Sequence, residues 1–175
     1  DESGDVAISE KLRVASGPAV IAFALVTIFF GFDFLMSTAP KWYSTIFSVN
    51  FWGGAMIGTY ATLILLAMAV QRAGLVKRTI TVEHYHDLGK WLFAFTFFWA
   101  YTAFSQFMLI WYGNLPEETV WYTYRMFNDW QWVSIAVGIG HWVFPFVFLL
   151  SRWTKRILPV LAAFAVWQLA FHWLD

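Results

Sequence analysis

Long apolar segments alternate with short polar links along this chain. The apolar segments run over residues 17–36, 46–73, 88–112, 130–150 and 157–174. Each is close to the roughly 20 residues that a helix needs to cross a hydrocarbon core of about 30 Å. Strands that cross a membrane are shorter and alternate polar with apolar positions, so these segments predict helices. We therefore predict an all-α, polytopic transmembrane helix bundle with five spans over residues 17–175, preceded by a polar segment at residues 1–16.

The composition favours a bilayer rather than water as the solvent. Hydrophobic residues make up 60% of the chain and charged residues 13%, whereas a soluble domain carries about 25% charged residues. The formal net charge is zero, so the chain lacks the overall positive charge that attracts nucleic acid. The chain has no cysteine, so its own ligands cannot form a disulfide, a thiolate metal site or an iron–sulfur cluster.

Basic residues predict the orientation in the membrane. If the N-terminus is cytoplasmic, the inside segments hold nine basic residues and the outside segments hold two, Lys41 and Arg125. The inside residues are Lys11, Arg13, Arg72, Lys77, Arg78, Lys90, Arg152, Lys155 and Arg156. Cytoplasmic loops carry the excess of Lys and Arg in membrane proteins, so we predict a cytoplasmic N-terminus.

Small residues at four-residue spacing predict close helix packing at two places. Gly54 and Gly58 form one such row, which Thr62 continues, and Ser134 and Gly138 form the other. Small residues at this spacing let two backbones approach each other in lipid. We interpret both rows as packing faces.

Polar residues lie at every depth of the predicted spans, counted at about 1.5 Å per helical residue. His86 and Asp87 lie at the inner surface, and Tyr60, Tyr101 and His141 lie near the middle. Toward the outer side lie Asp33, Asn50, Gln106 and His172. An ionisable residue inside a membrane is a functional hypothesis by default. One hypothesis is a proton path of His86, Asp87, Tyr60, Tyr101, His141 and Asp33.

Each of these residues also has a structural interpretation. Asp33 could bond to the link that follows it, and His141 could bond a backbone carbonyl in a helix seam. Buried tyrosines most often serve packing. At the inner surface, Thr81 is an expected helix N-cap, and acidic residues in early helical turns favour the helix dipole.

Histidine spacing argues against a metal or haem site. His84 and His86 are two residues apart and do not face each other on a helix. His141 lies about 14 Å and His172 about 22 Å above the inner boundary, while His86 lies at the boundary itself. No two histidines on different spans share a level in this count, so we predict no bis-histidine haem and no metal site.

Several motifs resemble the F subunits of bacterial alternative complex III, which belong to the polysulfide-reductase-like superfamily of membrane anchors. They are "FDFLMSTAPKWYSTIF" at residues 32–47 and "HDLGKWLFAFTFFWAYTAFSQFMLIWYGNLPEET" at residues 86–119. Further along, "HWVFPFVFLLSR" at residues 141–152 and "QLAFHWLD" at residues 168–175 are also similar. The family's chain continues past this last motif. We therefore expect these spans to be part of a larger subunit.

The resemblance implies a non-redox, multi-pass subunit of a quinol-oxidising complex in the bacterial inner membrane. Quinol or menaquinol would be oxidised in the complex, and partner subunits would hold its iron–sulfur clusters and haem c. The implied partners are a homologous membrane subunit, an iron–sulfur subunit and c-type cytochromes, with no catalytic site complete in this chain. Proton conduction through polar half-channels is implied as well.

Two alternatives to this role remain open. The chain could bind quinol directly through the outer polar residues Asn50, Gln106 and His172 together with Asp33. It could also be a purely structural membrane anchor, in which every buried polar group is satisfied internally.

Overall fold

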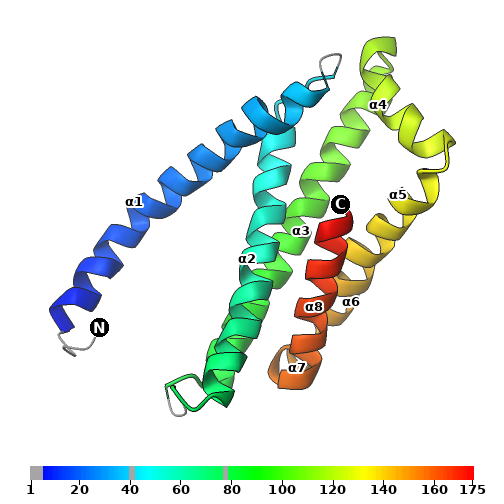
Figure 1. Cartoon of the computed structure of the whole chain (residues 1–175). Helices are drawn as coiled ribbons and strands as arrows, with labels where there is room; N and C mark the ends of the chain where they lie inside the picture. Colours follow the sequence, from blue (N-terminus) through cyan, green and yellow to red (C-terminus); the bar gives the residue numbers. More distant parts are fainter. Residues whose placement is uncertain (1–5, 40–41, 77–78) are drawn as a thin grey trace.

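The computed structural model describes residues 6–39, 42–76 and 79–175, and these residues form helices and no strands. In chain order (Figure 1), the elements are α1 (Val6–Phe30), the π-helix η1 (Gly31–Leu35), the 3-10 helix η2 (Met36–Thr38), α2 (Phe47–Arg72), α3 (Val82–Gly113), α4 (Pro116–Phe127), α5 (Gln131–Val137), the π-helix η3 (Gly138–Val143), α6 (Phe144–Leu150), α7 (Arg152–Arg156) and α8 (Leu158–Leu174).

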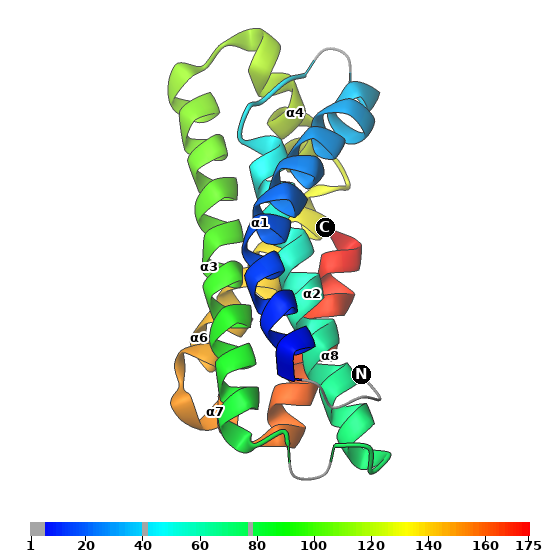
Figure 2. The same ribbon diagram turned by 90° about the vertical axis from the view of Figure 1, so that its left-hand side faces the viewer.

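The helices form a bundle from which α1 departs. Helices α2, α3 and α8 run side by side with the continuous rod α5–η3–α6, while α1 meets α2 only near one end (Figures 1 and 2). At that end, Gly31 contacts Ser48, and Phe30 stacks on Phe51 with ring centroids 6.3 Å apart. We call the end of the bundle that carries α7 the inner end and the end that carries α4 the outer end.

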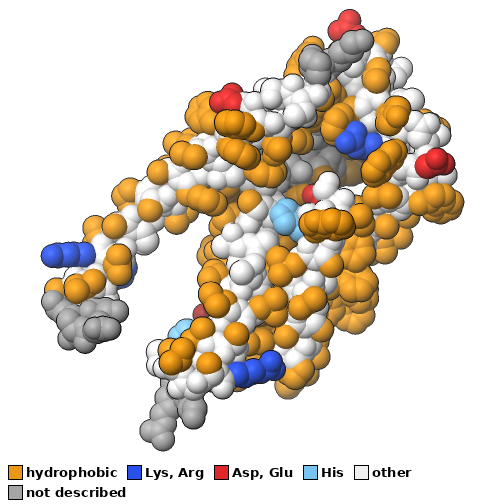
Figure 3. Space-filling view, viewed as in Figure 1, with side chains coloured by type: hydrophobic (Ala, Val, Ile, Leu, Met, Phe, Trp, Pro, Cys, Tyr) orange, Lys and Arg blue, Asp and Glu red, His pale blue; other side chains and the backbone are white. Residues whose placement is uncertain are grey.

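The core of the bundle lies between α2, α3, α6 and α8. Ile57, Ile64, Leu92, Leu149 and Leu161 are completely buried there. Much of the remaining surface is hydrophobic, with charged side chains mostly near the ends of the helices (Figure 3). This distribution is the one expected of helices that lipid surrounds.

Within the described residues, four helical segments are long and apolar enough to cross a membrane. They are Val6–Thr38, Phe47–Arg72, Val82–Gly113 and Gln131–Leu150, and the fifth apolar helix, α8, has 17 residues. The prediction of an all-helical membrane protein is thereby supported. Three of the basic residues behind the predicted orientation, Lys41, Lys77 and Arg78, lie outside the described residues.

Helix boundaries differ from the predicted spans in four places. Helix α1 begins at Val6, inside the segment predicted as a polar N-terminal region, and α3 begins six residues before residue 88. Two links predicted as non-helical contain α4 and α7. Pro116 occupies the first turn of α4, where a missing N–H costs nothing, and α4 then places polar and aromatic side chains on different faces. Hydropathy alone marks the apolar part of a helix and misses its polar turns.

The start of α3 explains one of the two histidines in its first turns. Thr81 is the N-cap as predicted, and the ring Nδ1 of His84 accepts a hydrogen bond from the Thr81 backbone N–H at 3.1 Å. His84 thus takes the place that Glu or Gln holds in the usual capping box. It serves the helix terminus rather than a metal site.

Glycines pack closely against a neighbouring helix at two places. At one of these places, the packing glycine is not the predicted one. A Cβ on Gly54 would lie 2.8 Å from the His172 ring, and one on Gly58 would lie 3.3 Å from it, so this row is a packing face. In η3, however, a Cβ on Gly138 would meet nothing within 4 Å, whereas one on Gly140 would lie 2.1 Å from the Phe171 ring. The packing glycine of this span is therefore Gly140.

Candidate functional site

One face of α3 carries a buried row of polar side chains through the middle of the bundle. Thr96, Thr102 and Gln106 are all buried, although the helix around them is strongly apolar. Each of the first two receives a hydrogen bond from a different helix. Gln168 of α8 donates to Thr96 Oγ1 at 2.8 Å, and Asn50 of α2 donates to Thr102 Oγ1 at 2.8 Å and to the Trp99 carbonyl at 2.9 Å.

Two histidines from different helices meet beside this row. His141 is fully buried, and its ring centroid lies 5.8 Å from that of His172. The Trp99 ring lies against His141 with centroids 4.3 Å apart, and the Trp99 indole N–H donates to Asp175 Oδ2 at 3.2 Å. The pair is enclosed on the α2 side by Gly54 and Gly58, whose missing side chains leave room for the His172 ring.

The contact between these histidines corrects the depths counted from the sequence. Their Cα positions differ in depth by that count, but the Cα–Cβ bonds of a helix lean toward its N-terminus. The α5–α6 rod starts at the outer end and α8 starts at the inner end, so the two side chains lean toward each other. The counted difference in depth between His141 and His172 is therefore no argument against these two residues binding one haem iron.

Four buried polar atoms of this cluster have no hydrogen-bond partner among the described residues. They are Nδ1 and Nε2 of His141, Nδ1 of His172 and Oε1 of Gln168. A buried polar atom without a partner is costly, and water is its ordinary partner inside a protein. A neutral imidazole offers one donor and one acceptor, so this pair can hold and pass a proton through hydrogen-bonded water. We call His141, His172, Gln168, Thr96 and Trp99 the mid-bundle cluster.

The backbone at His141 is also unusual. His141 lies in η3 and Asp33 lies in η1, the two π-helical segments of the described chain. Single π-turns in long helices occur often at functional sites, because they cost stability and re-aim a side chain. In η3 the widened turn places His141 toward the bundle interior, whereas in η1 the side chain of Asp33 is exposed.

At the inner end, the predicted proton entrance is built from exposed ion pairs. Asp87 bonds Lys90 at 2.7 Å, and Glu83 pairs with Arg156 of α7 and lies 4.0 Å from His86 Nδ1. The like charges of Glu83 and Asp87 therefore face separate basic partners. The ion pair of Glu83 with Arg156 links α3 to α7, and Asp87 remains exposed to water.

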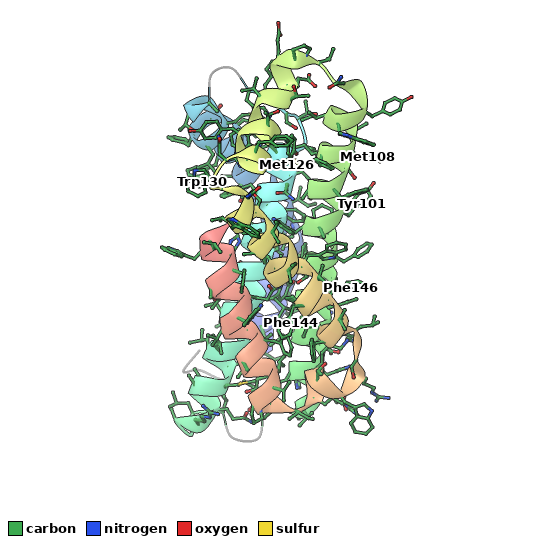
Figure 4. The ribbon with its side chains drawn as sticks, turned by 90° about the vertical axis from the view of Figure 1, so that its right-hand side faces the viewer. Tyr101, Met108, Met126, Trp130, Phe144 and Phe146 are labelled. Carbon is green, nitrogen blue, oxygen red and sulfur yellow. The ribbon has the colours of Figure 1, made fainter. Side chains whose placement is uncertain are left out.

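The middle of the predicted path is not assembled as the sequence suggested. Tyr101 is 59% exposed and points away from the bundle (Figure 4), so it lies on the opposite side of α3 from His141. Tyr60 is half-buried and packs against both Trp91 and Phe95, with ring centroids 5.9 and 5.6 Å away. Tyr60 therefore serves packing, and Tyr101 faces the surroundings of the bundle.

The outer residues proposed for quinol binding do not converge either. Asn50 donates a hydrogen bond to the Trp99 carbonyl of α3, and His172 belongs to the mid-bundle cluster. Among the described residues, no hydrogen bond or ring contact joins Asp33, Gln106 and His172. No group of three His, Asp or Glu side chains in the described ranges is placed to hold a metal ion.

Sequence reasoning missed three members of the mid-bundle cluster, Thr96, Gln168 and Trp99. A signal for Gln168 was present, because an amide in the middle of an apolar span needs a partner. Thr96 and Trp99 give no such signal, since a helical Thr can bond its own backbone and Trp is common in membrane helices. Their role depends on which helix faces them.

Comparison with known proteins adds no relative. No protein-family model matches the chain, and no curated protein matches it significantly.

Proposed function

We propose that this chain is a multi-pass subunit of a quinol-oxidising respiratory complex in the bacterial inner membrane, and that its mid-bundle cluster moves protons. The observation that carries the proton role is the buried pair of His141 and His172, whose ring nitrogens lack partners among the described residues. The respiratory role is supported by the resemblance in the motifs of residues 32–47 and 86–119.

The proposed topology has five spans, with α8 as the fifth and the N-terminus cytoplasmic. The N-terminal end of α1, the link between α2 and α3, and α7 share the inner end (Figures 1 and 2). That end carries Arg72, Lys90, Arg152, Lys155 and Arg156, whereas α4 at the outer end carries Arg125. This distribution supports a cytoplasmic inner end. At 17 residues, α8 would span about 26 Å, which a thin or locally compressed bilayer accommodates.

The proposed route uses His141 and His172 as the proton-holding groups and the polar row of α3 as its lining. Gln168 and Thr96 lie on the inner side of the pair, and Asn50 and Thr102 lie on its outer side. Water between these groups would complete the path toward Asp87 at the inner surface. Tyr101 has no place in this route, and Asp33 joins it only if a neighbouring chain covers η1.

Helix α1 supports a place inside a larger assembly. None of its residues is buried within Val6–Phe30, so it offers an apolar helix to whatever surrounds it. The implied partners are a homologous membrane subunit, an iron–sulfur subunit and c-type cytochromes.

The test is to isolate the complex that contains this chain, identify its subunits by mass spectrometry and measure protons released per electron in vesicles. We expect His141→Gln and His172→Gln to lower coupled turnover on the order of 100-fold, the range of one positioned proton-transfer group. Tyr101→Phe is the matched control and should leave turnover unchanged. Normal turnover and proton release in both histidine variants would contradict the proton role, and a complex without haem or iron–sulfur partners would contradict the respiratory role.

A further inference from the structure

A hollow of about 900 Å³ opens at the outer end of the molecule, away from the mid-bundle cluster. It is lined by Ala39, Trp42 and Tyr43, which follow the first helical segment, and by residues of α4. Its walls are mostly aromatic and apolar: Trp42, Tyr43, Val120, Trp121 and Tyr124 all contribute. A hollow of this size is large enough for part of a lipid or a drug-sized ligand.

Among the described residues of the lining, one is a cation. The guanidinium carbon of Arg125 lies 3.3 Å from the centroid of the Trp121 ring, and Trp121 stacks on Trp42 at 4.3 Å. In the part of the chain that the structure describes, no carboxylate forms an ion pair with Arg125, although Asp175 lies near enough to act on it electrostatically. Its side chain donates a long hydrogen bond to the Trp121 carbonyl at 3.5 Å. Burial lowers the pKa of Arg125 and raises that of neighbouring Tyr122 to about 12.

A second unsatisfied donor lines the same hollow. The indole N–H of Trp42 is buried and has no hydrogen-bond partner among the described residues, and Trp42 itself is only 7% exposed. An N–H left without an acceptor in an apolar site costs free energy. The hollow is therefore lined by a charged donor, Arg125, and by Trp42, whose buried indole N–H lacks an acceptor.

We propose that this hollow binds an anionic glycerophospholipid. Its phosphate would accept from Arg125, an ester or phosphate oxygen would accept from Trp42, and an acyl chain would lie on Tyr43, Val120 and Tyr124. Glu117 also lines the hollow, but its carboxylate is exposed and so is screened by water and salt. This inference requires only that the chain lies in a membrane and does not depend on the respiratory role.

Charge and amphipathic shape favour this ligand over two others. A free phosphate ion would satisfy Arg125 but leave the aromatic walls facing water. A neutral quinone would cover those walls but leave the guanidinium without a counter-charge. A lipid with a negative headgroup meets both demands, and Trp and Tyr are the residues that gather at headgroup level in membrane proteins.

The experiment uses the complex that contains this chain in nanodiscs of phosphatidylcholine with a trace of photoactivatable phosphatidylglycerol. We measure the label on residues 116–127 relative to the label from a photoactivatable phosphatidylcholine. We expect an approximately fivefold preference for phosphatidylglycerol, as for one basic residue acting on an anionic lipid. Arg125→Gln should abolish the preference, Arg125→Lys should retain most of it and Trp42→Phe should reduce it.

Two control variants separate this site from general surface charge. Glu117→Gln removes an acidic side chain that lines the hollow and should leave the preference equal or higher, and Arg152→Gln, at the opposite end, should leave it unchanged. Equal labelling by both lipids in the unmodified chain, or an unchanged preference in Arg125→Gln, would overturn the proposal. So would loss of the label on adding inorganic phosphate, which indicates a free anion, or on adding a quinone analogue, which indicates a quinone site.

Discussion

Helix α1 and the bundle of α2, α3 and α8 are similar in sequence character but opposite in packing. Helix α1 belongs to the most apolar of the four long segments, yet none of its residues is buried, while α2 and α3 bury residues along their whole length. Apolar character therefore does not decide which helices associate in lipid. The bundle helices are instead distinguished by glycines and by polar side chains that bond across helix interfaces.

The physical reason is that lipid solvates an apolar helix as well as another apolar helix does. Association then depends on close packing and interhelical hydrogen bonds. The bundle has both, at Gly54, at Gly140 and between Gln168 and Thr96. In α1, the hydroxyl of Thr27 bonds the carbonyl of Phe23 in its own helix, and a Cβ on Gly17 would meet nothing within 4 Å.

The largest expected difference comes from filling a glycine in each region. Gly140→Ala places a methyl group where the Phe171 ring now lies, and overpacking of this kind costs about 1–3 kcal/mol of unfolding free energy. Gly17→Ala in α1 and Gly138→Ala, two residues from Gly140, should be neutral or stabilising by up to about 1 kcal/mol. Unfolding of the full chain in mixed micelles measures all three. A loss in Gly17→Ala as large as that in Gly140→Ala would contradict the comparison.

A smaller difference in unfolding free energy is expected when side-chain hydrogen bonds are removed from the two regions. Gln168→Leu removes the donor to Thr96, and interhelical hydrogen bonds in membranes contribute about 0.6 kcal/mol on average. Thr27→Val in α1 removes only a bond within one helix and should change the unfolding free energy by less than about 0.5 kcal/mol. The double variant Gln168→Leu with Thr96→Val gives the coupling energy directly, and additive losses would show that the two side chains do not interact.

A pH dependence should distinguish a buried cation of the bundle from an exposed one. Burial lowers the pKa of Lys155 below its ordinary value of 10.5, while its ammonium donates to the Leu149 carbonyl at 2.7 Å. The unfolded chain then binds the proton more tightly, so stability should rise with pH between the lowered folded value and 10.5. Lys155→Met should flatten this rise. Lys11→Met, which removes an exposed ammonium on α1, should preserve it, and an identical slope in Lys155→Met would assign the rise to another group.

The smallest effect is expected for the ion pair on α1. Arg13 bonds Glu10 at 2.6 Å, and both side chains are largely exposed. Such pairs contribute about 0.3–0.5 kcal/mol at most, less at high salt. Arg13→Gln should therefore be nearly silent in thermal unfolding of the chain, and a loss above about 1 kcal/mol would show that α1 takes part in the folded core.

Much of the fold could be predicted from the sequence, because length and hydropathy are local properties. The helical class and the Thr81 cap are confirmed, and four of the five predicted spans are helices long enough to cross a membrane. The polar turns of helices could not be found from hydropathy, so helix α4 was missed, whereas the Thr81 cap located the polar start of α3. The candidate site was predicted in part: His141 is central, but the exposed Tyr101 and Asp33 lie outside the cluster.

The sequence by itself determined which apolar segments are helical and which residues are polar within them. Only the tertiary structure decided which of those residues meet, because that depends on the direction of each helix and on the rotation of each helix about its axis. Counting residues places His141 and His172 at different depths and so predicts that they are apart. Because their helices are antiparallel, the two side chains lean toward each other and their rings meet. In the same way, α4 brings Arg125 and Trp121 to Trp42 from a distant part of the chain, and no local pattern contains that contact.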